Sequence, residues 1–104
     1  MATADSVHFA AAARLLAAEA RERGLAVPGF RSPPRLVGAD RSLRRRADGS
    51  AVVAVRLRGR PIEAVVADMV DGLLAANDLV AGDAARHRGS MVTAVLDRGA
   101  RPAA

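Results

Sequence analysis

The segment from Arg41 to Arg60, RSLRRRADGSAVVAVRLRGR, most constrains the fold because it has the pattern of a β-hairpin. The dipeptide Asp48-Gly49 is typical of the turn between two antiparallel strands. After this turn, large hydrophobic residues occupy every second position, namely Val53, Val55 and Leu57. A two-residue period of this kind indicates a strand with one buried face. We therefore expect an arginine-rich β-hairpin over residues 41–58.

Two hairpin registers are compatible with the turn, and the burial of arginine decides between them. A two-residue turn would place Arg44 and Arg46 on the same face as the valines, where their charges would be buried. A three-residue turn, with Gly49 in the left-handed conformation of a bulge, places Leu43 opposite Val53 instead. We adopt this second register. It gathers four arginines on the outer face of the hairpin: Arg44, Arg46, Arg56 and Arg58.

The same register predicts where the other charged residues of the hairpin lie. Asp40 falls opposite Arg56, which favours a cross-strand ion pair. Arg41 and Arg45 fall at the margins of the apolar face, where their stems can lie along it while the guanidinium groups reach water.

Composition indicates one small domain in a reducing compartment. A chain of 104 residues is long enough for a single hydrophobic core. The absence of cysteine excludes disulfides and thiolate metal sites and suits the cytoplasm. Every basic residue is arginine, and alanine is abundant, a bias that we attribute to a GC-rich, bacterial genome. Asp5 argues against a signal peptide, and no apolar run is long enough for a membrane span, so we expect no membrane partner.

Helical patterns flank the hairpin, so we predict an α+β fold with the order α-β-β-α-α. Hydrophobic residues recur at helical spacing over residues 6–23, and Gly24 ends this helix. Residues 24–40 contain Pro-Gly and Pro-Pro and are expected to form a connector, anchored in the core by Phe30. The strongest helical pattern covers residues 61–77, with Asn77 as its left-handed cap.

A third helix is predicted over residues 83–98, followed by a loose tail over residues 99–104. Gly89 interrupts this helix, so the residues around 91–96 could instead form a short strand. Arg88 falls near the start of the helix, where the dipole disfavours a cation. It therefore needs an anion, supplied by the preceding helix or by a neighbouring subunit, unless the first turn of the helix is frayed.

Positive charge is concentrated in one third of the chain. Residues 31–60 contain nine arginines and two aspartates, whereas residues 61–104 contain four arginines and six acidic residues. Residues 1–30 are balanced, with three residues of each sign. A basic hairpin beside a slightly acidic remainder favours an anionic partner or a second copy of the chain.

The sequence contains no motif of an enzyme, a cofactor site or a metal site. It has no phosphate-binding glycine loop, HExxH, CxxC or nucleophile elbow. Asp83, His87 and Ser90 lie along one side of the third predicted helix, but side chains on one exposed helix rarely converge into a catalytic triad. We therefore predict a non-enzymatic protein without cofactor.

Three interpretations of the arginine face remain at this point. In the first, Arg44, Arg46, Arg56 and Arg58 bind the backbone of DNA or RNA without strong sequence preference, because the sequence lacks stacking aromatics and any helix-turn-helix, RRM or KH signature. In the second, the domain is a protein–protein interaction or homodimerisation module. The arginine face then meets an acidic surface, for example that of Asp68, Asp71 and Asp78 in another copy. In the third, the arginines only keep the protein in solution.

The proposed register makes a direct prediction about Gly49. Gly49→Val should destabilise the protein by at least about 1 kcal/mol, because a β-branched residue is strained at positive φ. Urea or thermal unfolding measures the effect. A neutral substitution would contradict the three-residue turn.

Overall fold

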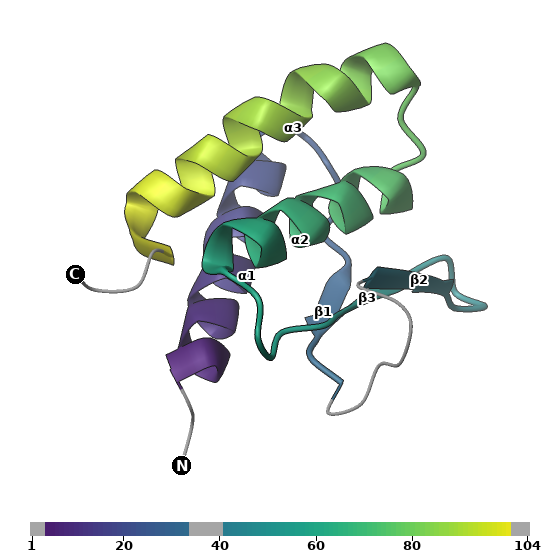
Figure 1. Ribbon diagram of the computed structural model, residues 1–104. Coiled ribbons are helices and arrows are strands. Elements are labelled where there is room, and N and C mark those ends of the chain that lie inside the picture. Colours follow the sequence, from purple (N-terminus) through teal and green to yellow (C-terminus); the bar gives the residue numbers. More distant parts are fainter. Residues whose placement is uncertain (1–3, 34–40, 101–104) are drawn as a thin grey trace.

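The computed structural model describes residues 4–33 and 41–100, which form an α+β domain of three helices and a three-stranded sheet (Figure 1). The helices are α1 (Ala4–Glu22), α2 (Ile62–Ala76) and α3 (Ala81–Val95). A π-helical turn, η1 (Leu96–Ala100), extends α3. The strands are β1 (Gly29–Arg31), β2 (Arg41–Arg45) and β3 (Ala51–Val55). The predicted α+β class is confirmed.

The β2–β3 hairpin has the predicted register. Leu43 lies opposite Val53 in an antiparallel pairing. The amide of Arg46 donates to the carbonyl of Ser50 (2.8 Å), and Gly49 adopts φ 87°, as a three-residue bulged turn requires. The hairpin is nevertheless shorter than predicted, because β3 ends at Val55. Arg56 and Arg58 therefore follow the strand, and Asp40, the expected partner of Arg56, lies outside the described residues.

A third strand lies within the segment that we expected to be only a connector. β1 pairs in parallel with β3, so that Phe30 lies opposite Val53 and the strand order is β1-β3-β2. Phe30 packs against the hydrophobic core, as predicted. Three residues are too few to display a strand period in the sequence, and the pairing with β3 depends on contacts far along the chain.

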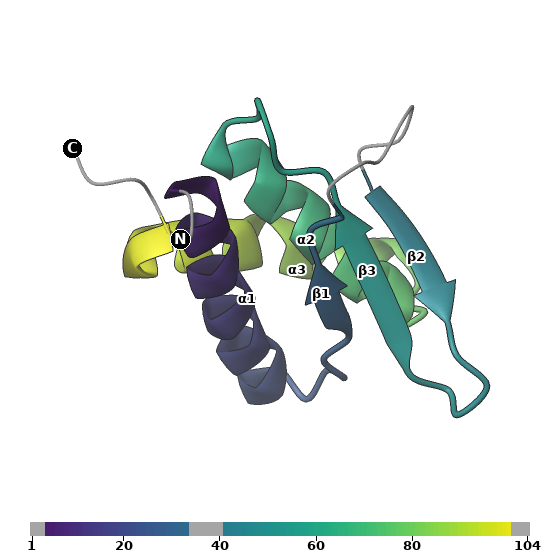
Figure 2. The same ribbon diagram turned by 90° about the horizontal axis from the view of Figure 1, so that it is seen from below.

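One face of the sheet is covered by helices and the other is not. In Figure 2 the sheet faces the viewer, with α2 and α3 behind it and α1 beside β1. The core lies between these layers and includes Val53 and Val55 of β3, Leu16 of α1, Met69 of α2 and Met91 of α3. Each of these side chains is almost fully buried. The residues of β2 and β3 that point away from the core therefore form an outer face that no helix covers.

The helix boundaries depart from the sequence predictions by up to three residues, one cap differs, and the predicted third helix is confirmed over the strand alternative. After α2, the left-handed residue is Asp78 (φ 52°), whereas Asn77 is right-handed and uses its side chain elsewhere. Residues 91–96 are helical rather than extended, because helical spacing buries Met91 and Val95 together. The predicted tail is partly ordered, since Ala100 ends η1 and is fully buried.

α2 lies very close to β3 at Gly72. A Cβ atom at this position would lie 2.5 Å from Cγ1 of Val53, closer than two carbon atoms can pack. Only glycine lets the helix backbone approach the strand to this distance. Gly89 of α3 offers a matched contrast, because a Cβ atom there would meet nothing within 4 Å.

We predict opposite effects for alanine at these two helical glycines. Gly72→Ala should destabilise the protein by about 1–3 kcal/mol, since overpacking outweighs the gain in helix propensity. Gly89→Ala should stabilise it by about 0.5–1 kcal/mol, because only the propensity changes. Equilibrium unfolding in urea measures both. Equal effects at the two positions would show that α2 does not approach β3 this closely.

Candidate functional site on the outer face of the sheet

Arginines from two strands surround a shallow hollow on the outer face of the sheet. Its volume is about 180 Å³. Val52 and Ala54 of β3 form its floor, and its rim combines three guanidinium groups with one hydroxyl, those of Arg31, Arg44, Arg46 and Ser42. The hollow therefore offers a concentrated set of hydrogen-bond donors with positive charge.

The strand registers explain why these side chains share one face. Ala54 lies between Arg31 of β1 and Ser42 of β2, and directly paired residues point to the same side of a sheet. Arg44 lies opposite Val52 in the next row. The sequence analysis placed Arg44 and Arg46 on this face but did not include Arg31, because it did not detect β1. The only local indication of β1 in the sequence is that Phe30 stands between a glycine and an arginine.

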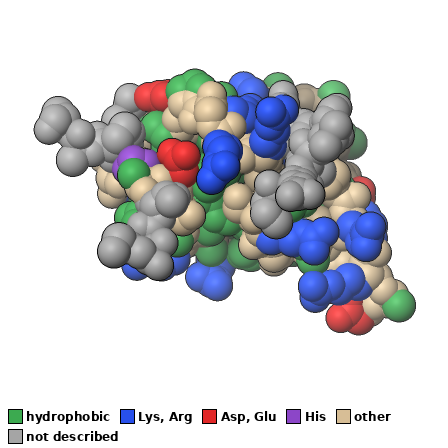
Figure 3. All heavy atoms as spheres, turned by 60° about the horizontal axis from the view of Figure 1, so that its bottom comes forward, with side chains coloured by type: hydrophobic (Ala, Val, Ile, Leu, Met, Phe, Trp, Pro, Cys, Tyr) green, Lys and Arg blue, Asp and Glu red, His purple; other side chains and the backbone are tan. Residues whose placement is uncertain are grey.

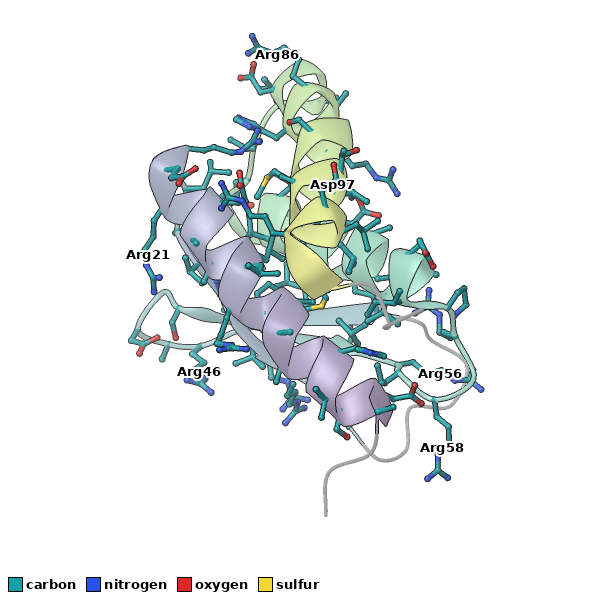
Figure 4. All side chains as sticks on the ribbon, turned by 90° about the vertical axis from the view of Figure 1, so that its left-hand side faces the viewer. Arg21, Arg46, Arg56, Arg58, Arg86 and Asp97 are labelled. Atoms are coloured by element: carbon teal, nitrogen blue, oxygen red, sulfur yellow. The ribbon has the colours of Figure 1, made fainter. Side chains whose placement is uncertain are left out.

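Arg56 and Arg58 lie apart from this hollow. Both follow β3 and are exposed. In Figure 4, Arg46 lies at one end of the hairpin while Arg56 and Arg58 lie at the other, and the side chains of Arg46 and Arg58 point away from the helices. Figure 3 shows arginine side chains spread over this side of the molecule, with few acidic groups among them. The four predicted residues are thus distributed along the hairpin rather than gathered at one point.

The arginines of the hollow have no acidic partner among the described residues. Arg31, Arg44 and Arg46 take part in none of the ion pairs between described residues. The six arginines that do form such pairs are Arg23 and Arg98 with Glu19, Arg45 with Asp78, Arg60 with Asp68, Arg86 with Asp83, and Arg88 with Asp71. The other described arginines, Arg14, Arg21, Arg41, Arg56 and Arg58, form no such pair either, so the hollow gathers three of the eight unpaired arginines at one place.

The carboxylate of Asp48, the acid nearest to Arg46 in sequence, is hydrogen-bonded within the hairpin turn. Its carboxylate accepts hydrogen bonds from the hydroxyl (2.6 Å) and the amide (2.9 Å) of Ser50. These bonds, first the hydroxyl and then the amide, hold the pKa of Asp48 below its usual range, and the charge of Arg46 adds to the effect. Asp48 therefore stabilises the turn as an anion.

Two further sequence predictions about arginine are confirmed. Arg88 obtains its anion from the preceding helix, since Nε donates to Oδ1 of Asp71 at 2.7 Å and this bond raises the pKa of Arg88. Arg45 lies at the margin of the inner face, where it donates to Asp78 (2.7 Å) and to the carbonyl of Ala75 (3.1 Å).

Asp83, His87 and Ser90 do not form a chain of acid, base and nucleophile. Asp83 pairs with Arg86, and Arg23 donates both to Nδ1 of His87 (3.2 Å) and to Oγ of Ser90 (2.9 Å). Arg23 also pairs with Glu19, which is only 4% exposed. This network joins the end of α1 to α3.

Neither a metal site nor a membrane helix is found in the described part of the chain. No group of three or more potential ligands among its histidine, aspartate and glutamate residues could hold a metal ion. None of its helices is both long and apolar enough to cross a bilayer.

Comparison with known proteins adds no relative. No family model matches the sequence, and searches of curated proteins and of solved structures gave no significant match.

The side chain of Asn77 holds the segment that leads into β1. Its amide oxygen accepts from the amide of Ala26 (2.8 Å), and its amide nitrogen donates to the carbonyls of Ala26 and Leu73 (both 2.9 Å). This clamp joins residues 51 positions apart in the sequence. It thereby fixes the approach to β1, and with it the position of Arg31.

Asn77→Ala should therefore destabilise the protein by about 1–2 kcal/mol, because three hydrogen bonds are lost at a partly exposed site. Asn77→Asp keeps the acceptor for the amide of Ala26, but its second oxygen would face the carbonyls of Ala26 and Leu73 at the negative end of α2, so it should destabilise the protein at least as much. Urea unfolding of the two variants measures both effects. If either variant is as stable as the wild type, the side chain of Asn77 does not hold this segment.

Proposed function

We propose that this chain is a non-enzymatic binding protein whose outer sheet face contacts the phosphate backbone of DNA or RNA. Arg44 and Arg46 provide one part of the contact surface, and Arg56 and Arg58 provide another part at the opposite end of the hairpin. Arg31 adds to the first part. From the absence of cysteine we also infer a cytoplasmic location.

The observation that carries this proposal is the gathering of unpaired arginines on the outer face of the sheet. Arg45, Arg60 and Arg88 pair with carboxylates of the same chain, whereas Arg31, Arg44 and Arg46 share an open face without such partners among the described residues. Uncompensated guanidinium groups attract anions, and their planar forks match the oxygens of phosphate. Release of counterions from the nucleic acid then supplies the binding free energy.

The same face favours binding with little sequence preference. Phe9 and Phe30 are the only aromatic residues in the sequence, and both pack against the core. Bases therefore find no aromatic ring to stack on, and contacts to the backbone dominate.

The interaction-module alternative is weakened in the form that uses a second copy of the chain. Asp68, Asp71 and Asp78, the acids expected to meet the arginine face, each pair with an arginine of their own chain. A second copy would have to exchange these pairs for new ones, with little gain in free energy. An acidic surface of another protein remains the alternative partner.

Neutralisation of the face tests the proposal. Changing Arg44, Arg46, Arg56 and Arg58 together to Gln should abolish binding to generic duplex and single-stranded oligonucleotides without loss of the fold. Each single change should reduce the slope of log affinity against log salt by about one where the arginine contacts a phosphate. Fluorescence anisotropy over a range of salt concentrations measures both effects.

Two exposed arginines of α1, Arg14 and Arg21, provide a control of equal charge. The Arg14→Gln/Arg21→Gln variant should bind as the wild type does, in contrast to Arg44→Gln/Arg46→Gln. Equal loss in the two double variants would show that net charge alone matters. A wild-type protein without affinity for any nucleic acid at low salt would refute the proposal. A quadruple variant that loses a protein partner or an oligomeric state would favour the alternative.

A further inference from the structure

β2 forms one edge of the described sheet and has backbone groups available for another strand. The strand order is β1-β3-β2, so β2 has a strand neighbour only on the side of β3. The bond from the amide of Arg46 to Ser50 fixes which residues donate toward β3, because such residues alternate along an antiparallel pair. The backbone amides and carbonyls of Ser42 and Arg44 point toward β3. Those of Arg41, Leu43 and Arg45 therefore point outward, away from β3.

A groove lies on the helix side of this edge. Its volume is about 510 Å³, and β2 contributes Arg41 to its lining. Its remaining walls come from the end of α2 and the start of α3. They combine apolar residues, including Leu74, Leu79 and Ala84, with the charged side chains of Asp71, Asp78 and Arg88. Leu43, on the same side of β2, is 36% exposed although its partner Val53 is fully buried. The edge thus combines backbone groups without a strand partner and apolar surface that the described residues leave uncovered.

Charge decides which kind of strand fits this edge. A strand paired with β2 would meet Arg45 on the helix side, where Asp78 already compensates its charge. On the outer side, the same neighbour would approach Arg44 and Arg46, which have no carboxylate partner among the described residues. The edge therefore attracts a strand that carries acidic residues on its outer side.

We propose that the edge of β2 binds an extended peptide of a partner protein in which acidic and apolar residues alternate. In antiparallel pairing, the peptide residues opposite Arg41, Leu43 and Arg45 form the backbone bonds and point their side chains to the helix side. Apolar side chains there contact Leu43 and the groove. The intervening residues point to the outer face, where carboxylates meet Arg44 and Arg46. This site differs from the nucleic-acid face in its use of backbone pairing, and it does not require the function proposed above.

The decisive experiment uses two N-methylated forms of one peptide. The probe is a short, acetylated and amidated peptide of alternating Glu and Val, with its affinity measured by fluorescence anisotropy. In the proposed pairing, the Val amides bond to β2 and the Glu amides face away. N-methylation of every Val should therefore weaken binding by about tenfold or more, because each lost backbone bond costs a factor of a few. N-methylation of every Glu should leave the affinity nearly unchanged.

A second peptide tests the charge, and a pair of variants tests the edge. A peptide of alternating Lys and Val should not bind at low salt. Leu43→Pro removes an outward-facing amide together with the leucine side chain and is tolerated at an edge, so it should fold and lose affinity. Leu43→Val keeps the amide and should retain affinity. Should Leu43→Pro fail to fold, the two N-methylated peptides on the wild-type protein still decide the question.

Several outcomes would overturn the proposal. These are equal affinity for the two N-methylated peptides, binding of the Lys-Val peptide as strong as that of the Glu-Val peptide, and full affinity of a folded Leu43→Pro variant. Light scattering that shows a dimer converted to a monomer by Leu43→Pro would also overturn it, because a second copy would then occupy the edge.

Discussion

The contact of α2 with β3 at Gly72 determines the arrangement of the whole domain. Because a side chain at this position would collide with Val53, the backbone of α2 lies directly on the inner face of the sheet. α1 and α3 then pack against α2, and all helices stay off the outer face (Figures 1 and 2). A sheet in which only one face is buried leaves its second face to polar side chains. The arginine face is thus a consequence of how tightly the opposite face is packed.

Electrostatics follows this division in part. Several arginines near helices pair with carboxylates of the chain, as Arg88 does with Asp71 and Arg45 with Asp78. Exposed pairs of this kind add little stability, typically below about 1 kcal/mol each. Their larger effect is on the field around the molecule. They cancel positive charge at six arginines, whereas Arg31, Arg44 and Arg46 keep theirs together on the outer face.

The sequence predicted the local features of this structure well. The alternation of hydrophobic residues and the Asp48-Gly49 turn predicted the hairpin. The free-energy cost of burying arginine then favoured the register with the bulged turn. The helical spacing around Leu73 predicted α2, and the helix dipole predicted an anion for Arg88. Each of these predictions depends on residues that are close in sequence, or on a single charge that must be compensated.

Features that depend on distant contacts were not predictable in the same way. β1 is too short to show a period and exists because β3 offers it an edge, so Arg31 was not included in the face. The role of Asn77 depends on Ala26, which is far away in sequence, and the need for glycine at position 72 depends on Val53. A single sequence contains no signal for such pairs, because their residue types are ordinary for a cap, a loop and a helix.

The parallel pairing of β1 with β3 also has a consequence for the order of folding. The hairpin is a local structure with a short loop, so Arg44 and Arg46 can reach their final positions early. Phe30 and Val53 are separated by the connecting segment, β2 and the turn, and their pairing must close a longer loop before any contact offsets the lost entropy. We therefore expect the arginine face to be completed in two kinetic stages. Arg31 joins it only when β1 docks beside a hairpin that has already formed.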